Sequence, residues 1–560
     1  MEQERLVRPI LEVARSLDLD PALVVPYGRD KAKITLDALE SGRPPGRLIL
    51  VSAITPTDAG EGKTTTSIGL AQGFARLGQR VCLALREPSL GPTFGQKGGA
   101  TGGGLSRIVP ESDINLHFTG DFHAIGSAHN LLAAMLDNHI YHGNALGIDP
   151  RRVMWRRVID MNDRSLRHVV IGLGGVLEGV PRETGFDITP ASEVMAVLCL
   201  SEGYDDLRRR LSRIIVSLTS ERAPVTAADL RAVGAMMALL KDAMLPNLVQ
   251  TCEGVPALVH GGPFANIAHG CNSVVATKMA LARADWVLTE AGFGFDLGAE
   301  KFFDIKCVSA GLDTAAVVLV ATVRALKLHG GVVKTALAAP DAVAVERGLG
   351  NLAKHVENIR IFGESPVVAL NRFATDTDDE IAVVRRWCEA ENVPFAVSDV
   401  FSRGGDGGTA LAEAVMAHAE RRAKPFTPLY ELRDSIPVKM EKVARAMYGA
   451  REVAWTKEAQ KALAQIEKLG FGGLSLCIAK TQKSLSDDPQ RLGRPEDFEI
   501  TVRDVLLAAG AGYVVPLLGD IMRMPGLPLS PQAERMDLVN GDVVYAPGGP
   551  VSASATLPPA

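Results

Sequence analysis

Apolar and polar positions alternate in blocks along the chain, and these blocks predict a repeating order of strands and helices. The apolar run Leu48–Ile54 is followed by a glycine-bearing turn and then by a helical pattern from Ser67 to Leu77. Further strand-like runs lie at residues 80–85, 168–173, 286–289, 316–320, 366–370 and 394–397. Because helical stretches separate most of these runs, we predict an α/β fold with a parallel sheet.

The last third of the chain carries a different pattern. Residues 425–437 contain several prolines and predict a boundary or a rigid turn, whereas residues 454–468 predict a charged amphipathic helix. Residues 546–560 are rich in Pro, Ala, Ser and Gly and have no periodicity. We therefore expect a flexible tail at this end.

Composition places the chain among large globular enzymes. It has 560 residues, 47% of them hydrophobic, and a net charge of −5. The acidic balance and an aromatic content of 5% argue against nucleic acid as a partner. The first residues lack the features of a signal peptide, and the longest apolar run, residues 315–323, is too short to span a bilayer. We expect a cytoplasmic protein with no membrane partner.

The cysteines support the same compartment. There are 7 of them, none is spaced as CxxC, and most lie in apolar runs. We predict reduced core residues rather than disulfides or metal ligands.

The segment Thr55–Thr66 has the pattern of a phosphate-binding loop. Its glycines let backbone N–H groups turn toward an anion, Lys63 reaches the outer phosphates, and the hydroxyl of Thr64 or Thr65 suits Mg²⁺. One departure is Thr57, which stands where the usual pattern has a glycine; the alternative is an ordinary strand-to-helix turn. The predicted nucleotide-binding residues are Thr57, Asp58, Ala59, Gly60, Glu61, Gly62, Lys63, Thr64 and Thr65.

Charged and glycine-rich residues follow the next predicted strand. Arg86 and Glu87 come first, and residues 98–104 are mostly glycine. Because loops that follow parallel strands share one edge of the sheet, we expect these residues beside the phosphate-binding loop. An arginine there suits a carboxylate or a transferring phosphoryl group. The alternative is a surface Arg–Glu pair that closes a strand.

Acidic residues and histidines gather in the next segment. Asp113 and Asp121 suit contacts with Mg²⁺ or with its water ligands. The histidines do not have the spacing of a zinc site, so structural roles are the better prediction. These histidines are His117, His123, His129, His139 and His142.

Several blocks of the chain together resemble one enzyme family. They are residues 52–66, 86–104, 113–142, 263–270, 290–294, 296–307, 375–377, 404–408, 479–482 and 516–522. Their sequences resemble formate–tetrahydrofolate ligase, also called 10-formyltetrahydrofolate synthetase, of the monofunctional bacterial type. The resemblance runs from about residue 20 to about residue 545.

This resemblance implies a reaction and roles for particular residues. ATP phosphorylates formate to formyl phosphate, and N10 of tetrahydrofolate then attacks the formyl carbon. Lys63 and Arg86 are the implied catalytic residues, and Arg86 would hold formate and formyl phosphate. Thr65, Glu87 and Asp121 are the implied metal ligands. The resemblance also implies a parallel sheet core of the P-loop NTPase type.

The resemblance further implies a division of the chain. Residues 1–360 would form a nucleotide- and formate-binding P-loop domain, with an inserted helical and α/β region at about 140–285. Residues 361–545 would form additional α/β structure on the folate side, before the tail at 546–560.

The residues implied for folate binding depart from the family pattern. The family holds the flat folate between a Phe in Phe-Pro-Thr-Asp and a Trp before a glycine-rich loop. Here Phe373 remains, the Pro position is Ala374, and Phe401 replaces the Trp. Phe293 is a further implied folate contact. The alternative for Phe373 and Phe401 is that they are hydrophobic residues at the rim of a loop.

Two other classes of nucleotide-binding protein remain open as alternatives. One is a small-molecule ligase or kinase that uses another carboxylate. The other is a dimerising regulatory ATPase, against which residues 57–59 count because they lack an early lysine. The family resemblance implies a homotetramer and leaves open an activating monovalent cation.

Overall fold

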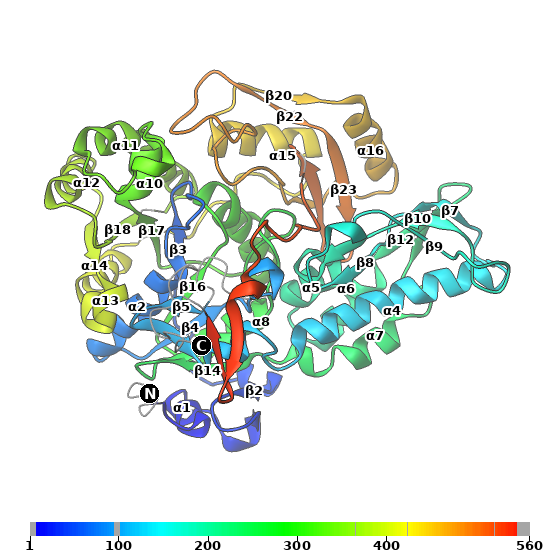
Figure 1. The fold of residues 1–560 in the computed structure, drawn as a ribbon, viewed down its shortest axis with the longest axis horizontal. Helices are drawn as coiled ribbons and strands as arrows, with labels where there is room; N and C mark the ends of the chain where they lie inside the picture. Colours follow the sequence, from blue (N-terminus) through cyan, green and yellow to red (C-terminus); the bar gives the residue numbers. More distant parts are fainter. Residues whose placement is uncertain (1–6, 95–100, 365, 423, 520, 546–560) are drawn as a thin grey trace.

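The largest part of the fold is a central sheet of strands that are mostly parallel. A computed structural model describes residues 7–94, 101–364, 366–422, 424–519 and 521–545. The strands follow the order β1–β2–β14–β15–β4–β16–β3–β17–β18–β19, and β6 with its partner β5 joins at β14 (Figure 1). All neighbours from β15 to β19 pair in parallel. The predicted α/β fold with a parallel sheet is confirmed.

The strands of this sheet coincide with most of the apolar runs in the sequence. Their bounds are β1 (Val24–Pro26), β2 (Ala32–Ile34), β3 (Arg47–Ala53), β4 (Val81–Leu85), β5 (Gly102–Gly103), β6 (Ser106–Val109), β14 (Asn247–Thr251), β15 (Pro256–Val259), β16 (Trp286–Glu290), β17 (Ala316–Ala321), β18 (Pro366–Asn371) and β19 (Phe395–Ser398).

Helices cover both faces of the central sheet, as the alternation of side chains along its strands requires. On one face, Ile49 and Val51 of β3 pack with α2 (Lys63–Arg76) and α14 (Thr409–Ala419). On the other, Leu48 and Leu50 belong to the cluster that includes α8 (Val274–Arg283), α10 (Val323–His329) and α11 (Ala342–Ile361). With both faces buried, the strand ends are the part of the sheet available for binding.

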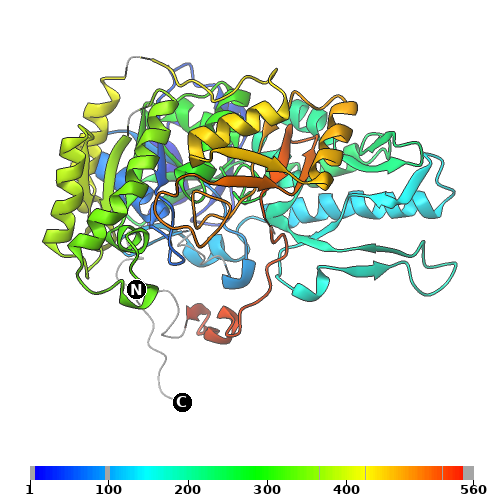
Figure 2. The ribbon, with the colours of Figure 1, turned by 90° about the horizontal axis from the view of Figure 1, so that it is seen from above.

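A second region extends to one side of the central sheet (Figure 2). It contains the long helix α4 (Asp121–Tyr141) and a three-stranded sheet in the order β13–β12–β7. The remaining elements are β7 (Ile148–Val153), β8 (Arg157–Ile159), β9 (Val169–Ile171), β10 (Arg182–Thr184), β11 (Phe186–Ile188), α5 (Glu193–Leu200), α6 (Tyr204–Ser212), β12 (Ile215–Thr219), β13 (Pro224–Thr226) and α7 (Val233–Leu239).

One predicted strand lies in this region and not in the parallel sheet. The run at residues 168–173 forms β9, which pairs antiparallel with β10 in a separate hairpin. Val170 and Leu173 are 57% and 66% exposed, and Val169 and Ile171 are half-buried. Apolar content alone could not distinguish this exposed hairpin from a buried strand.

A third region packs above the sheet and is built from residues beyond 425 (Figure 1). Helix α16 begins at Lys457, inside the predicted range 454–468. The other elements are α15 (Ile436–Val443), β20 (Glu452–Trp455), β21 (Ser475–Leu476), β22 (Glu499–Val502), β23 (Asp504–Ala508) and β24 (Tyr513–Leu517). Strands β25 (Met536–Val539) and β26 (Asp542–Tyr545) form a separate antiparallel hairpin, drawn in red below this region in Figure 1. The predicted tail, residues 546–560, lies outside the described residues.

The predicted domain limits do not coincide with the edges of the central sheet. Strands β14 and β15 and helix α8 of the central sheet lie within the range 140–285 expected for an insertion, while residues 148–239 form the side region. Likewise, β18 and β19 lie beyond residue 360 and complete the central sheet. The division into domains at these limits stays a prediction.

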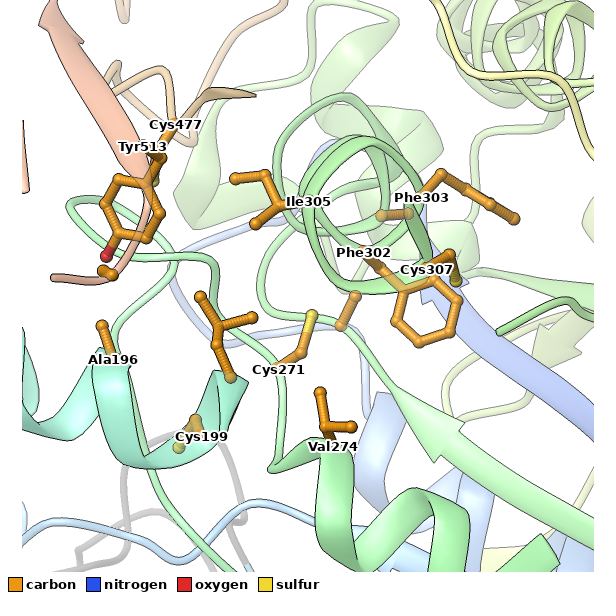
Figure 3. Packing of buried hydrophobic residues seen from close by; sticks show 14 of the residues in the cluster. Ala196, Cys199, Cys271, Val274, Phe302, Phe303, Ile305, Cys307, Cys477 and Tyr513 are labelled. Atoms are coloured by element: carbon orange, nitrogen blue, oxygen red, sulfur yellow. The ribbon is translucent and has the colours of Figure 1, made fainter. Parts of the chain in front are cut away.

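The cysteines contribute to the apolar core, as predicted. All are free thiols, and all except the half-buried Cys252 are buried. Cys199, Cys271 and Cys307 belong with Phe302 to one cluster of buried residues (Figure 3). Burial raises the pKa of Cys271 to about 11, so this thiol stays protonated and unreactive. Among the helices of the described residues, none has the length and apolar character needed to cross a membrane.

Candidate active site

Polar and aromatic residues, several of them predicted site residues, gather where the parallel strands of the central sheet end. A loop with polar or aromatic side chains follows each strand, and in a parallel sheet these loops lie at the same edge. The residues that follow or close each strand are Arg86 for β4, Glu290 for β16, Thr55–Gly62 for β3, Thr322 for β17, Asn371 and Phe373 for β18, and Phe401 for β19.

The loop between β3 and α2 has a backbone that requires glycine. Gly60 and Gly62 have φ values of +76° and +71°, in the left-handed region that favours glycine. A Cβ on Gly62 would lie 2.4 Å from Nδ2 of Asn371. Gly62 is also the N-cap of α2, so Lys63 begins the helix at its positive end. These features agree with the predicted phosphate-binding loop.

Glu61 holds the loop in shape from within. Its carboxylate accepts a hydrogen bond from the backbone N–H of Thr57 at 2.7 Å and another from the hydroxyl of Thr322. Asn371 donates to the backbone carbonyl of Glu61 at 3.1 Å. Glu61 is only 1% exposed, so its carboxylate shapes the loop and is not free to contact solvent.

The outer turn of the loop is tied to distant parts of the chain by charge. Asp58 lies 2.9 Å from the ammonium group of Lys483 and also pairs with Lys334. Hydrogen bonds from these lysines lower the pKa of Asp58. The turn that precedes Lys63 is therefore held from the side of α10 and from the third region.

The start of the loop is anchored on α10 and α11. The hydroxyl of Thr55 lies 3.0 Å from Nε2 of His355 and accepts a hydrogen bond from the Asn351 amide at 3.0 Å. The backbone carbonyl of Thr55 lies 2.9 Å from Nε2 of His329. His329 Nδ1 accepts from the N–H of Gly493, so its Nε2 must carry the proton that bonds to Thr55. Burial lowers the pKa of His355 to about 4, which keeps this ring neutral.

A guanidinium and a hydroxyl meet at Glu290, at the end of β16. The hydroxyl of Thr64 donates to the Glu290 carboxylate at 2.8 Å, and the Arg86 guanidinium lies 3.9 Å from its other oxygen. Burial lowers the pKa of Lys63, and the charge of Glu290 opposes this effect. The structure thus places Arg86 and the first turn of α2, which Lys63 begins, beside one carboxylate at the ends of the adjacent strands β4, β16 and β3.

Small residues leave room around the Arg86 guanidinium. It donates to the carbonyl of Pro263 at 3.4 Å, and a Cβ added to Gly292 would lie 3.3 Å from its Nη1. Its Nε is buried with no hydrogen-bond partner among the described residues. Arg86 is therefore a half-buried side chain with unused donor capacity, which suits the binding of an anion.

Glu87 and Asp121 were predicted as metal ligands, but their surroundings differ from those of Arg86 and Glu290. Both oxygens of Asp121 are engaged, one with Lys33 at 2.7 Å and one with Asn247 at 2.7 Å. Burial and the charge of Asp121 raise the pKa of Glu87 well above its usual value. Across the described ranges there is no group of three or more His, Cys, Asp and Glu side chains arranged to hold a metal ion.

Thr65, the third predicted metal ligand, is a buried residue in the first turn of α2. A Cβ on Gly103 would lie 3.7 Å from the hydroxyl oxygen of Thr65, so this hydroxyl faces the glycine-rich segment that follows β4. The start of that segment, Gly98 to Ala100, lies outside the described residues. It is Thr64, and not Thr65, whose hydroxyl reaches Glu290.

The histidines of the segment 117–142 do not lie together in the site. His129 is buried between Ser192 at 2.8 Å and the carbonyl of Arg156 at 3.0 Å. Burial lowers its pKa to about 3. His139 accepts from the backbone of Leu146 at 3.0 Å. Both residues hold local structure, which agrees with the structural roles predicted for them.

The predicted aromatic residues follow neighbouring strands. Phe373 is half-buried, and the guanidinium of Arg324 stands 4.7 Å from its ring centroid. Phe401 is 44% exposed and packs against Gly104, whose Cβ would clash with its backbone. Phe293 is half-buried and takes a φ of +60°, a conformation that side chains rarely adopt. Such strain is often found at functional sites.

Sequence reasoning did not assign Glu290, Asn371 or Arg324 to the site. Glu290 and Asn371 each end a buried strand, and Arg324 follows shortly after β17. In the sequence, the only feature that could have identified them is their position as the first charged or amide side chains after an apolar run. Their contacts depend on the order of strands in the sheet, which the sequence alone does not give.

Comparison with known protein families agrees with this arrangement. The family model of formate–tetrahydrofolate ligase matches residues 1–545 of the 560-residue chain. The match includes every strand of the central sheet and all the loops at the edge where Lys63, Glu290 and Arg86 lie. The chain belongs to the formate–tetrahydrofolate ligase family, whose members use ATP to make 10-formyltetrahydrofolate in one-carbon metabolism.

Proposed function

We propose that the edge beyond β4, β16 and β3 phosphorylates formate with ATP and delivers the resulting formyl phosphate to tetrahydrofolate. The observation that carries this proposal is the meeting of Arg86 and Thr64 at Glu290, beside the helix that Lys63 begins. Lys63 stands at a helix N-terminus, where phosphates bind well, and Arg86 is a half-buried arginine whose Nε has no partner among the described residues.

Lys63 and the loop backbone would bind the phosphates of ATP. Lys63 begins α2, and the N–H groups of the first helical turn are free of intrahelical partners. Charge develops on the transferring phosphoryl group, so a preorganised cation there lowers the barrier more than it strengthens ATP binding.

Mg²⁺ is a further part of this proposal, and the oxygen groups beside the loop suit it. Thr64 and Glu290 provide a hydroxyl and a carboxylate within 2.8 Å of one another. These are the ligand types that Mg²⁺ prefers, usually together with substrate phosphates. Glu87, with its raised pKa, and the fully bonded Asp121 suit it less. Bound there, the ion would neutralise charge on the transferring phosphoryl group.

Arg86 would hold formate and then formyl phosphate. A guanidinium binds a carboxylate or a phosphate through parallel hydrogen bonds, and it remains charged when buried. Pro263 and Gly292 lie beside the guanidinium. We expect the site to accept formate in preference to a larger acid. Measuring turnover with acetate in place of formate tests this selectivity.

Tetrahydrofolate would bind beside Phe373, Phe401 and Phe293. The exposed ring of Phe401 offers a flat surface, and a neutral aromatic ring stacks well on a pterin. In this position N10 would attack the formyl carbon, and phosphate would leave. Bound folate would cover the half-buried rings of Phe373 and Phe293 and would help to keep water from formyl phosphate.

Assembly and location are also proposals. We propose a homotetramer in the cytoplasm. The exposed apolar tip of the β9–β10 hairpin, where Val176 and Leu177 are 88% and 81% exposed, supports self-association. Sedimentation equilibrium would report four times the chain mass of 59.5 kDa. Rates in potassium chloride and in choline chloride would show whether a monovalent cation activates.

The test of the proposed chemistry is product formation. The protein, MgATP, formate and tetrahydrofolate should yield 10-formyltetrahydrofolate, which acid converts to the absorbing 5,10-methenyl form, and acetate should not replace formate. Lys63→Ala should lower the rate at least about 100-fold, since it removes charge stabilisation of the transition state. Lys278→Ala, which disturbs only a surface ion pair with Glu202, is the control.

Two results would contradict the proposal. Near-normal turnover in Lys63→Ala would exclude the loop as the phosphate site. Unchanged formate KM and kcat in Arg86→Ser would exclude Arg86 as the formate site, while both variants retain the wild-type melting temperature.

A further inference from the structure

Arg324 lies between the phosphate-binding loop and the aromatic residue proposed for folate. Its Nη2 donates to the backbone carbonyl of Gly60 at 2.9 Å. The same guanidinium stands over the ring of Phe373, 4.7 Å from its centroid. One rigid, planar group therefore touches both proposed binding sites at once.

A second connection runs in parallel with the first. Asn371, two positions before Phe373 at the end of β18, donates to the carbonyl of Glu61 at 3.1 Å. The consecutive carbonyls of Gly60 and Glu61 are thus both held by residues from the folate side of the sheet.

These hydrogen bonds orient the groups that would bind phosphate. In a planar trans peptide the C=O and the following N–H point in opposite directions. Fixing the carbonyls of Gly60 and Glu61 therefore turns the N–H groups of Glu61 and Gly62 away from Arg324 and Asn371. Successive N–H groups held in this way form an anion-binding concavity.

We infer that Arg324 is a positioning residue that couples tetrahydrofolate binding to nucleotide binding; this inference rests on the proposed function. Arg324 covers one face of Phe373, so a folate ring stacks on the opposite face. Stacking fixes the Phe373 ring, the ring fixes the guanidinium, and the guanidinium fixes the Gly60 peptide. The nucleotide then meets a loop that is already ordered, and less ordering entropy is lost on binding.

Coupling of this kind is reciprocal and measurable. Tetrahydrofolate should tighten the binding of ATP by about fivefold or more, and ATP should tighten tetrahydrofolate by the same factor. The enzyme would in this way favour formyl phosphate formation when its acceptor is present, which limits loss of the intermediate to water.

The experiment compares Kd values for a non-hydrolysable ATP analogue with and without saturating tetrahydrofolate. Wild type should show the coupling factor, and Arg324→Met should reduce it to within about twofold of unity. The analogue's Kd without folate should change little in Arg324→Met, because Asn371 and Thr322 still hold the loop. Arg372→Met is the matched control, since its exposed side chain pairs with Asp378 and should leave the coupling intact.

Phe373→Leu provides an independent arm should Arg324→Met fold poorly. Phe373→Leu keeps the hydrogen bond from Arg324 to Gly60 but removes the aromatic face. The coupling between tetrahydrofolate and the ATP analogue should therefore fall even when folate is saturating. An unchanged coupling factor in Arg324→Met or in Phe373→Leu, or a wild-type factor of one, would overturn the inference. Unchanged folate affinity in Phe373→Leu would instead refute the folate assignment, which separates the two failures.

Discussion

At the scale of single residues, Phe401 carries the clearest departure from the family pattern. Phe401→Ala should raise the KM for tetrahydrofolate about tenfold, because stacking and its burial are worth roughly 1–1.5 kcal/mol. Phe401→Trp should lower it, and its 44% exposure leaves space for the larger indole. Steady-state folate titrations check both, and KM values for ATP and formate should stay near wild type.

Leu432→Ala is the control for this series, since Leu432 is a comparably exposed apolar residue in the third region. Equal folate KM in wild type, Phe401→Ala and Phe401→Trp would place Phe401 outside the site. A large loss of ATP binding in Phe401→Ala would show instead that the ring supports Gly103 and Gly104.

Single residues also show how far the sequence predicts the site. Lys63 and Arg86 could be identified because a strand, a glycine-bearing turn and a helix start are all local signals. Glu290 could not, because its contact with Thr64 arises only when β16 inserts between β3 and β4. Arg324 likewise needs β17 and β18 side by side before it can reach Phe373.

At the scale of elements, α2 offers a matched pair of glycines. Gly62 precedes its first turn and Gly78 follows its last, with φ values of +71° and +73°. Alanine at either site costs about 1–2 kcal/mol of backbone strain. Gly78 has open space around it, whereas a Cβ on Gly62 would collide with Asn371.

Gly62→Ala should therefore lower kcat/KM for ATP at least about tenfold, since the loop must shift to relieve the contact. Gly78→Ala should lose only stability, by about 1 kcal/mol, and should keep its activity. Parallel assays and thermal melts of the two variants check this expectation. Comparable ATP kinetics in both would mean that the shape of the loop does not govern nucleotide binding.

Elements also mark where prediction from sequence stops. Most of the buried parallel strands were predicted within a residue or two, because a short, continuous apolar run between two helices is typical of a strand buried on both faces. Strand β15, which pairs in parallel with β4, was not predicted. The run 168–173 has the same composition but forms an exposed hairpin, since its neighbours in space, and not its own residues, decide burial.

At the scale of the whole molecule, Glu193 connects the side region to the third region. Its carboxylate, at the start of α5, accepts from the N–H groups of Gly510 at 2.7 Å and Ala511 at 3.3 Å. Burial raises its pKa from 4.5 to about 7, and the backbone hydrogen bonds oppose this shift. The folded protein therefore holds a proton at Glu193 that the unfolded chain releases at lower pH.

The sign of the pH effect follows from that difference. Between pH 4.5 and about 7 the folded state binds more protons than the unfolded state, so stability falls as pH rises through this window. The loss is up to about 3 kcal/mol. Glu193→Gln keeps the acceptor oxygen and should remove this component, which melting temperatures at pH 5 and pH 7.5 would show. Parallel pH profiles of both proteins would contradict it.

The strand order has a consequence for how the protein is made. Strand β3, which leads into the phosphate-binding loop, is flanked by β16 and β17 and does not pair with β4, its neighbour in sequence. A ribosome adding about 5–20 residues per second reaches Trp286 tens of seconds after Ala53. Throughout that interval the nascent β3 has both edges open. Translation therefore releases a largely apolar strand of the site long before its partners exist, and protection of the nascent chain becomes part of building the enzyme.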